Sequence, residues 1–356
     1  MPGRNRMAQD KPVLITGGAG FIGINLADRL LRRGRPVIVY DSLARAGSEQ
    51  NLRWLREIHR SRLRVEIADM RETARLRDAV AEAGTVFHLA SQVAVTTSLD
   101  DPADDFAVNA GATLELLETL RRRGGAAGMI FTSTNKVYGA IDDIELAEEN
   151  SRYVPAGEFA ETGIAESRRL QFHSPYGCSK GAADQYVLDY ARSYGLPTAV
   201  FRMSCIYGPH QHGTEDQGWV AHFLIRAIQG RPITIYGNGK QVRDLLFVDD
   251  LVGALMLVEQ RLDEAAGRAF NIGGGPDNTI SLLELIGQIA ALHGEKPAVE
   301  FADWRVGDQR WYVSDSTSFN RATGWRPRVG VADGIRRLHD WLLANRRGAT
   351  ALQAAQ

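Results

Sequence analysis

The stretch Thr16-Gly17-Gly18-Ala19-Gly20-Phe21-Ile22-Gly23 decides the fold class of this chain. It joins a β-rich run to an amphipathic one, and its glycines at 17, 20 and 23 have the spacing G-x-x-G-x-x-G. Glycines at this spacing allow a tight turn, a close approach of the backbone to a ligand, and close packing of helix against strand. A glycine-rich loop alone also fits an ordinary strand-to-helix turn, so the flanking residues must decide.

The flanking residues favour a dinucleotide site. The N–H groups at the start of such a helix, together with its dipole, hold phosphate groups. We therefore expect a pyrophosphate to contact five residues of this turn: Gly17, Gly20, Phe21, Ile22 and Gly23. The next β-rich run ends in Asp41, roughly 20 residues on, where a carboxylate binds ribose hydroxyls and repels a 2′-phosphate. This predicts NAD rather than NADP, although Arg45 close by could soften the preference. Asp69 fits either an adenine contact or a helix N-cap.

Short β-rich runs alternate with helical patterns through the first 200 residues. The predicted strands are Pro12–Thr16, Pro36–Tyr40, Arg64–Ile67, Thr85–Ala90, Met129–Thr132 and Pro197–Arg202. The predicted helices between them include Ile22–Arg33, Val108–Arg123 and Ser179–Tyr194. This rhythm predicts an α/β fold with a doubly wound parallel Rossmann sheet, whose ligands bind at the carboxyl ends of its strands.

After Arg202 the rhythm breaks, which predicts a smaller, discontinuous substrate-binding domain. We expect Val248–Glu259 and Arg268–Ile272 to return to the main sheet, and Thr279–Leu292 and Val331–Asn345 to be helices. The expected domains are 11–203 with 244–273 for NAD binding, and 204–243 with 274–346 for the substrate. Residues 1–10 and 347–356 are expected to be disordered tails.

Composition excludes several classes of function. The formal net charge is −1, so no global attraction to nucleic acid or to an anionic membrane is expected. The two cysteines, Cys178 and Cys205, are too few for a disulfide framework or a zinc site, and they indicate a reducing, cytoplasmic location. No apolar run approaches the ~18 residues of a membrane span, and the polar N-terminus is not a signal peptide. No metal site is predicted.

Catalytic candidates follow the fifth predicted strand. Tyr176 and Lys180 form a Tyr-x-x-x-Lys motif, which places both side chains on one face of a helix. A phenol with a pKa near ~10 is a poor base at neutral pH, but a nearby ammonium and an oxidised nicotinamide stabilise the phenolate. Thr134, or Ser133, can hydrogen-bond the same substrate oxygen. The motif alone also fits a surface pair; its place after a Ser/Thr-rich strand end favours catalysis.

Together these motifs resemble the extended short-chain dehydrogenase/reductase superfamily of NAD-dependent epimerases and dehydratases, over roughly Lys11 to Asn345. The resemblance implies tightly held NAD, Tyr176 as the acid and base, Lys180 on the nicotinamide ribose and Thr134 as the assisting hydroxyl. Asn109 matches an Asn of the superfamily that is as often structural as catalytic.

The residues after Thr134 separate the reactions of this superfamily. In its 4,6-dehydratases an Asp-Glu pair at these positions eliminates water, whereas this chain has Asn135 and Lys136. Neither supplies the acid and base that elimination needs. The motifs Ser133–Gly139, His173–Tyr186, Asp216–Val220 and Gly237–Asp244 resemble the CDP-paratose 2-epimerase (CDP-tyvelose epimerase) group. That resemblance implies an isomerase: transient oxidation of a sugar carbon (C2 in the group), rotation of the keto-sugar, and reduction on its other face.

The expected substrate is a nucleotide-diphosphate sugar. Arg243 and Arg310 resemble the superfamily's diphosphate clamp, although each also fits a structural ion pair. The further expected sugar or base contacts are Thr96, Asn135, Gln217 and Trp219. His210-Gln211-His212 departs from the group, and because this segment is expected to face the substrate, the base or sugar can differ.

Three alternatives remain open at this stage. One is a dehydratase or lyase that uses the same oxidised intermediate with another acid or base, chosen from His173, His210, His212, Glu166 and Cys178. The second is a 4-epimerase of a UDP-sugar, and the third is a non-catalytic NAD-binding protein. The resemblance also implies a homodimer, paired through the helices Val108–Arg123 and Ser179–Tyr194.

Overall fold

A seven-stranded parallel sheet is the centre of the computed structural model, which describes residues 11–125 and 127–354. The strands follow the order β12-β8-β5-β4-β1-β2-β3. Their bounds are β1 Val13–Thr16, β2 Val37–Asp41, β3 Leu63–Ile67, β4 Thr85–His88, β5 Gly128–Thr134, β8 Thr198–Met203 and β12 Arg268–Ile272. The predicted α/β class is confirmed, as are the six predicted strands and the return of Arg268–Ile272 to the sheet.

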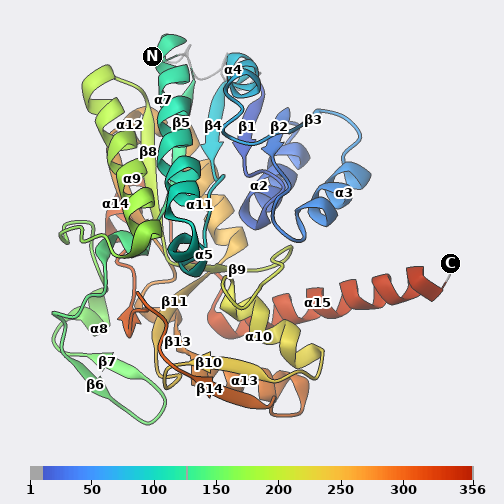
Figure 1. Cartoon of the computed structure of the whole chain (residues 1–356), viewed down its shortest axis with the longest axis vertical. Helices are drawn as coiled ribbons and strands as arrows, with labels where there is room; N and C mark the ends of the chain where they lie inside the picture. The colour runs from blue at the N-terminus through green and yellow to red at the C-terminus, as the bar shows by residue number, and fades with distance from the viewer. Residues whose placement is uncertain (1–10, 126, 355–356) are drawn as a thin grey trace.

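Helices cover both faces of this sheet (Figure 1). One face packs against α2 (Phe21–Arg32), α3 (Ser48–Ile58), α11 (Val248–Gln260) and α12 (Leu262–Ala265). The other face packs against α4 (Thr73–Glu82), α7 (Ala112–Arg122) and α9 (Ser174–Tyr194). Burial on both faces explains why β1, β4 and β5 are uninterrupted buried runs rather than alternating ones.

Two helices begin at residues other than those predicted. A π-helical turn, Ala107–Gly111, precedes α7 and follows α5 (Val95–Asp100) and α6 (Pro102–Phe106). The helix α9 begins at Ser174, five residues before the prediction, with Pro175 in its first turn. Proline is favoured there because the N–H that it lacks would have no partner within the helix. The earlier start places Tyr176 inside the helix.

A smaller part lies below the carboxyl ends of the main strands (Figure 1). Its largest sheet joins β13 (Thr279–Ser281), β11 (Val242–Phe247), β15 (Trp311–Tyr312) and β9 (Cys205–Tyr207), and a second sheet pairs β10 (Ile233–Tyr236) with β14 (Val299–Ala302). The helices here are α10 (Trp219–Ile228), α13 (Leu282–His293) and α15 (Val331–Ala354), and α14 (Thr317–Thr323) packs on β12. Leu224, Ile235, Leu285 and Leu338 belong to its separate core.

The structure departs from the expected boundaries in several places. The strand β11 contains residue 244 but pairs only within the smaller sheet, so the return to the main sheet begins with α11. The segment with β6 (Leu146–Glu148), β7 (Tyr153–Pro155) and α8 (Phe159–Thr162) lies beside the smaller part, where Tyr153 N–H donates to the Lys240 carbonyl at 3.0 Å.

Two helix ends also differ from expectation. The first three residues of the predicted helix Thr279–Leu292 form β13, and Ser281 then caps α13 in a capping box with Glu284. At the other end α15 continues to Ala354, through part of the predicted tail 347–356, because Ala, Leu and Gln there favour helix. The predicted tail 1–10 lies outside the described residues.

No helix within the described ranges has the length and apolar character needed to cross a membrane.

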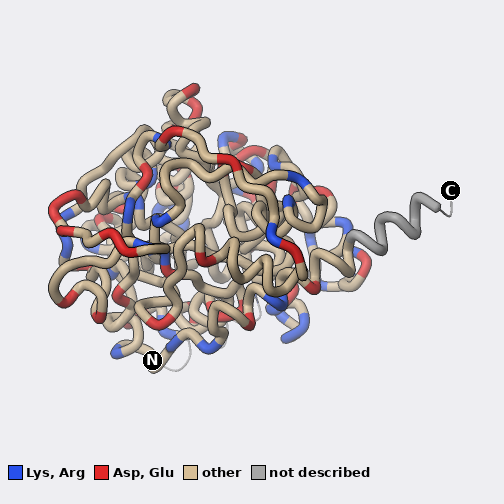
Figure 2. The backbone as a smooth tube through the Cα atoms, turned by 90° about the horizontal axis from the view of Figure 1, so that it is seen from below, with Lys and Arg blue, Asp and Glu red and all other residues tan. Residues whose placement is uncertain are grey.

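Basic and acidic side chains are interspersed along the chain rather than gathered on one side (Figure 2).

Candidate active site

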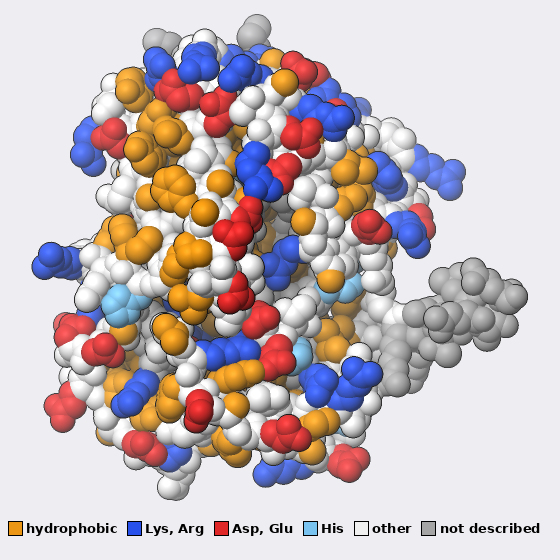
Figure 3. Space-filling view, viewed as in Figure 1, with side chains coloured by type: hydrophobic (Ala, Val, Ile, Leu, Met, Phe, Trp, Pro, Cys, Tyr) orange, Lys and Arg blue, Asp and Glu red, His pale blue; other side chains and the backbone are white. Residues whose placement is uncertain are grey.

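A cavity of about 760 Å³ lies where the carboxyl ends of the main strands meet the smaller part. Its walls come from residues that follow β1, β2, β3, β4 and β5, from α9, and from the segment between residues 203 and 220. The space-filling view shows the surface hollowed between the upper and lower parts (Figure 3). This is the edge at which doubly wound sheets bind their ligands.

The glycine turn has the shape needed for a pyrophosphate. Gly17 has φ +70°, and a Cβ on it would lie 2.7 Å from the Ala90 nitrogen, while a Cβ on Gly23 would lie 2.3 Å from the Gly17 carbonyl oxygen. Gly20 is the N-cap of α2 and places no side chain over the N–H groups of the first turn. Those N–H groups are therefore available to an anionic ligand at the helix N-terminus. The five residues predicted from this turn all line the cavity.

Asp41 and Asp69, the residues expected to contact the adenosine, line the same cavity. Burial raises the pKa of Asp41, although its carboxylate accepts hydrogen bonds from the N–H groups of Leu43 (2.8 Å) and Ala19 (3.0 Å), which act in the opposite direction. The Asp69 carboxylate is paired with Arg71 at 2.7 Å, which lowers its pKa. Glu72, not Asp69, is the N-cap of α4.

The three predicted catalytic residues all line the cavity. Thr134 ends β5, Tyr176 lies in the first turn of α9, and Lys180 follows one turn later on that helix. Burial raises the pKa of Tyr176 to about 12, against which its hydrogen bond with Thr134 lowers the pKa. Within the protein alone the phenol is therefore a weaker acid than a free tyrosine, and proton abstraction requires positive charge nearby.

Lys180 is a buried lysine whose pKa lies near neutral pH. Its Nζ donates to the Thr132 carbonyl oxygen at 2.7 Å and lies 4.2 Å from the centre of the Phe131 ring. Burial lowers the pKa of Lys180 to about 7, against the raising effect of Asp184 and Asp105. A desolvated lysine of this kind responds strongly to any charge that enters the cavity.

Asn109 has internal contacts for its whole side-chain amide. Its Nδ2 donates to Asp105 and to Ser179 of α9, both at 3.1 Å, and its Oδ1 accepts from the Gln92 N–H at 2.9 Å. Ser179 in turn donates to Asp105. This network holds α9, and with it Tyr176, against the π-helical turn.

The predicted substrate residues divide into two groups. Asn135, Gln217 and Trp219 line the cavity, and the Trp219 indole donates to the Cys205 sulfur at 3.5 Å. Thr97 lines the cavity in place of its neighbour Thr96.

Arg243 and Arg310 are not among the described residues that line the cavity. The buried Arg243 guanidinium donates to Asp308 (2.8 Å) and to the Gln309 carbonyl oxygen (2.6 Å). Arg310 is exposed, with its guanidinium 5.6 Å from the centre of the Trp304 ring. The diphosphate clamp expected from sequence stays a prediction, and in this structure both guanidinium groups contact other residues.

The loop with His210 and His212 lines the cavity and also packs between α3 and α15. Although both residues line the cavity, the His210 ring lies 4.0 Å from the centre of the Trp54 ring and 5.0 Å from that of Trp341. Burial lowers the pKa of His210 to about 4. Among the residues that the structure describes, no three His, Cys, Asp or Glu side chains gather as metal ligands would.

Sequence reasoning missed Asn51 and Arg71, which also line the cavity. Asn51 Nδ2 lies 3.2 Å from the carbonyl oxygens of both Ala19 and His210, so it ties the glycine turn to the loop of the smaller part. Its signal was a polar residue on the buried face of α3, beside Leu52 and Leu55. Arg71 bridges Asp69 to Asp104, a contact that no sequence spacing indicates.

Comparison with known proteins agrees with this geometry. The NAD dependent epimerase/dehydratase family matches residues 13–273. This chain belongs to that family. The CDP-paratose 2-epimerase of Salmonella typhi is 42% identical over 335 residues, which cover 92% of this chain and 98% of that protein.

Two similar solved structures contain bound NAD. A UDP-glucose 4-epimerase from Thermus thermophilus in complex with NAD has a TM-score of 0.78 at 33% identity, covering 93% of this chain and 98% of that one. A dTDP-glucose 4,6-dehydratase from Streptomyces venezuelae with NAD bound has a TM-score of 0.81 at 30% identity, covering 94% and 98%. NAD is therefore the cofactor, and the Gly17 turn and Asp41 fit it.

Proposed function

We propose that this family member is a nucleotide-sugar 2-epimerase that acts on a substrate like CDP-paratose or CDP-tyvelose. The observation that carries the proposal is the chemistry beside Thr134. The Asn135 amide donates to Gln309 Oε1 at 3.3 Å, and the Lys136 ammonium donates to the Gly307 carbonyl oxygen at 3.0 Å. Neither side chain supplies the carboxylic acid or the carboxylate that the elimination of water needs. The 42% identity to a CDP-paratose 2-epimerase supports the same reaction.

The positions and surroundings of the alternative acids and bases weigh against a dehydratase. His210 and His212 line the cavity, but burial lowers the pKa of both and so disfavours the protonated form that an acid needs. His173 and Cys178 are exposed and lie outside the cavity lining, as does Glu166, whose carboxylate accepts the Asn271 N–H at 2.7 Å. Of the described carboxylates that line the cavity, Asp41 and Asp69 are the expected adenosine contacts, Asp104 pairs with Arg71, and Asp216 is 3.5 Å from Arg305. No carboxyl group among these residues is placed beside Thr134 as a second acid.

The epimerase needs little more than the three catalytic residues. NAD, when bound, takes up a hydride and returns it. Tyr176 removes the proton from the sugar hydroxyl and later gives it back, Thr134 orients the same oxygen, and Lys180 stabilises the phenolate. The smaller part must hold the nucleotide diphosphate while the keto-sugar turns over. Arg243 and Arg310 remain the proposed clamp, which requires Arg310 to turn from Trp304 towards the cavity.

The test is turnover of CDP-, UDP-, GDP- and ADP-sugars, CDP-paratose among them, in heavy water. We expect one CDP-sugar to give an epimer of unchanged mass, with no deuterium at the inverted carbon, as read by NMR and mass spectrometry. A product lighter by one water would establish a dehydratase instead. Inversion of a UDP-sugar at C4 would establish a 4-epimerase.

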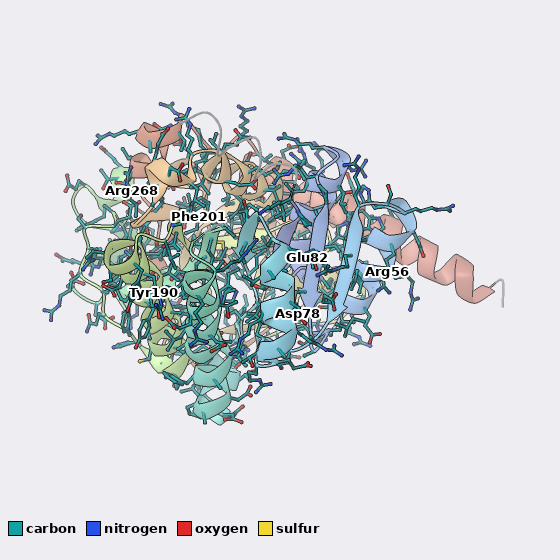
Figure 4. All side chains as sticks on the ribbon, turned by 90° about the horizontal axis from the view of Figure 1, so that it is seen from above. Arg56, Asp78, Glu82, Tyr190, Phe201 and Arg268 are labelled. Carbon is teal, nitrogen blue, oxygen red and sulfur yellow. The ribbon has the colours of Figure 1, made fainter. Side chains whose placement is uncertain are left out.

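We also propose a homodimer paired through α7 and α9. Tyr190 lies where these two helices are side by side and donates to Glu118 at 2.8 Å (Figure 4). Nearby apolar side chains face solvent: Phe106 is 58% exposed, Tyr186 45% and Tyr194 54%. Light scattering at micromolar concentration should give the mass of two chains. The mass of one chain would contradict this prediction.

A further inference from the structure

Gln309 is a fully buried side chain between the catalytic strand and the smaller part. Its exposed fraction is 0%, and its Nε2 donates to the Gly139 carbonyl oxygen at 2.6 Å. Its Oε1 accepts from Asn135 Nδ2 at 3.3 Å. Asn135 lies next to Thr134, and its Oδ1 is 3.3 Å from the Thr134 hydroxyl oxygen. A chain of side-chain hydrogen bonds therefore runs from the loop before β15 to Thr134.

The backbone carbonyl at one end of this series of hydrogen bonds determines which group donates in each bond. The Gly139 carbonyl can only accept, so the NH₂ group of Gln309 must face it. The Gln309 oxygen then faces Asn135, which must present its own NH₂ group there. This leaves the Asn135 oxygen towards Thr134, whose hydroxyl is the donor. Amide orientation is usually ambiguous, but a backbone carbonyl at the end of the chain removes the ambiguity here.

The loop that carries Gln309 is itself firmly held. Lys136 donates to the Gly307 carbonyl oxygen at 3.0 Å, and Arg243 donates to Asp308 at 2.8 Å and to the Gln309 carbonyl oxygen at 2.6 Å. The buried Gln309 amide thus has little freedom to turn. We propose that Gln309 is a positioning residue for Thr134, acting through the Asn135 amide.

The single proton of the Thr134 hydroxyl has two competing acceptors. One is Asn135 Oδ1, and the other is the oxygen of Tyr176 once this phenol is ionised. The Lys136 N–H, 3.2 Å from Thr134 Oγ1, is a donor and does not compete. By fixing the Asn135 oxygen towards Thr134, Gln309 limits how freely the hydroxyl turns to the phenolate, and so sets the basicity of Tyr176.

The position of Asn135 between Gln309 and Thr134 in this series of hydrogen bonds explains why residue 135 must be an amide. An aspartate would present a second acceptor to Gln309 Oε1, which would leave two buried oxygens facing each other. The inference rests on the Thr134–Tyr176 chemistry of the proposed function, and it does not depend on which sugar is bound.

The test compares Gln309→Leu with the wild type in two measurements. The first is the ultraviolet titration of the Tyr176 phenol in the NAD-bound enzyme, as the difference from a Tyr176→Phe variant. Without the Gln309 oxygen the Asn135 amide can turn its NH₂ group to Thr134, which frees the hydroxyl proton for the phenolate. The Tyr176 titration should therefore move to lower pH by about one unit. The other charged groups near Tyr176, which are Lys180, Arg45 and Asp105, are unchanged.

The second measurement is turnover of the substrate found above. The acidic limb of the kcat profile should move in the same direction, and the plateau kcat should fall by about tenfold because Thr134 is less well oriented. The KM should change by less than about twofold. In a Thr134→Val background, Gln309→Leu should shift neither the titration nor the limb.

Gln241→Leu is the matched control, since Gln241 is another buried glutamine of the smaller part, and its Nε2 donates to the Tyr236 carbonyl oxygen at 2.5 Å. It should leave both profiles in place. An unmoved Tyr176 titration in Gln309→Leu would overturn the inference, as would a shift that persists in the Thr134→Val background. If no nucleotide sugar is turned over, the proposed function fails while the titration still tests Gln309.

Discussion

Tyr176→Phe is expected to lower kcat by about a thousandfold and to leave NAD binding and the fold intact. The substitution removes one hydroxyl from a side chain that is 8% exposed, so packing in the first turn of α9 is preserved. It also removes the hydroxyl that hydrogen-bonds to Thr134 and that exchanges a proton with the sugar in the proposed reaction. Loss of a positioned acid and base costs 10²- to 10⁴-fold, and a thousandfold loss corresponds to about 4 kcal/mol of activation free energy.

The measurement is kcat and kcat/KM of the purified variant, with bound NAD measured in the same sample. Tyr190→Phe is the matched control, because Tyr190 lies on the same helix, and its hydroxyl donates to Glu118 and does not line the cavity. This control should keep wild-type kcat. If Tyr176→Phe retained more than about a tenth of the activity, another group would be the base.

The features that the sequence predicted correctly are those with a local physical cause. The turn between β1 and α2 needs glycine at 17 and 23 because no Cβ fits there. The parallel strands are apolar runs because helices bury both their faces. Tyr176 and Lys180 are one helical turn apart, so their spacing alone places both side chains on one face of α9, and both line the cavity.

The features that the sequence did not predict depend on contacts between distant segments. The Arg243 guanidinium donates to Asp308, 65 residues later, a contact that the expected diphosphate role does not indicate. Arg310 was expected in the cavity, yet it turns to the Trp304 ring. Gln309 reaches Asn135 across 174 residues of sequence. A polar loop residue has no periodicity, so its direction is set by tertiary partners that a single sequence does not identify.

Tertiary partners also determine the position of the His210 loop, which the sequence alone did not indicate. Two histidines around a glutamine in a loop indicated a surface in contact with substrate. Both histidines do line the cavity, but the rings of Trp54 of α3 and Trp341 of α15 also pack against His210 at tilted angles. The loop therefore joins the NAD side of the cavity to the C-terminal helix.

Lys180→Met is expected to lower kcat by about a hundredfold or more and to move the acidic limb of the pH profile to higher pH. Burial raises the pKa of Tyr176 to about 12 in the protein alone. Abstraction of the sugar proton requires the phenolate, and a positive charge nearby favours this form and lowers the pKa of Tyr176. Removing the ammonium therefore raises that pKa, so at any pH below the limb a smaller fraction of Tyr176 is ionised. The limb should rise by about one pH unit or more.

Lys240→Met is the matched control for this shift. Lys240 also carries an ammonium group, but its Nζ pairs with Glu148 at 2.9 Å and the residue does not line the cavity. The acidic limb should therefore stay where it is in the wild type. Lys180→Arg, which keeps the charge, should retain most of the wild-type limb position. If Lys180→Met lowered kcat with an unmoved limb, Lys180 would act only by holding the nicotinamide ribose, and the charge that ionises Tyr176 would have to come from the oxidised nicotinamide and Arg45.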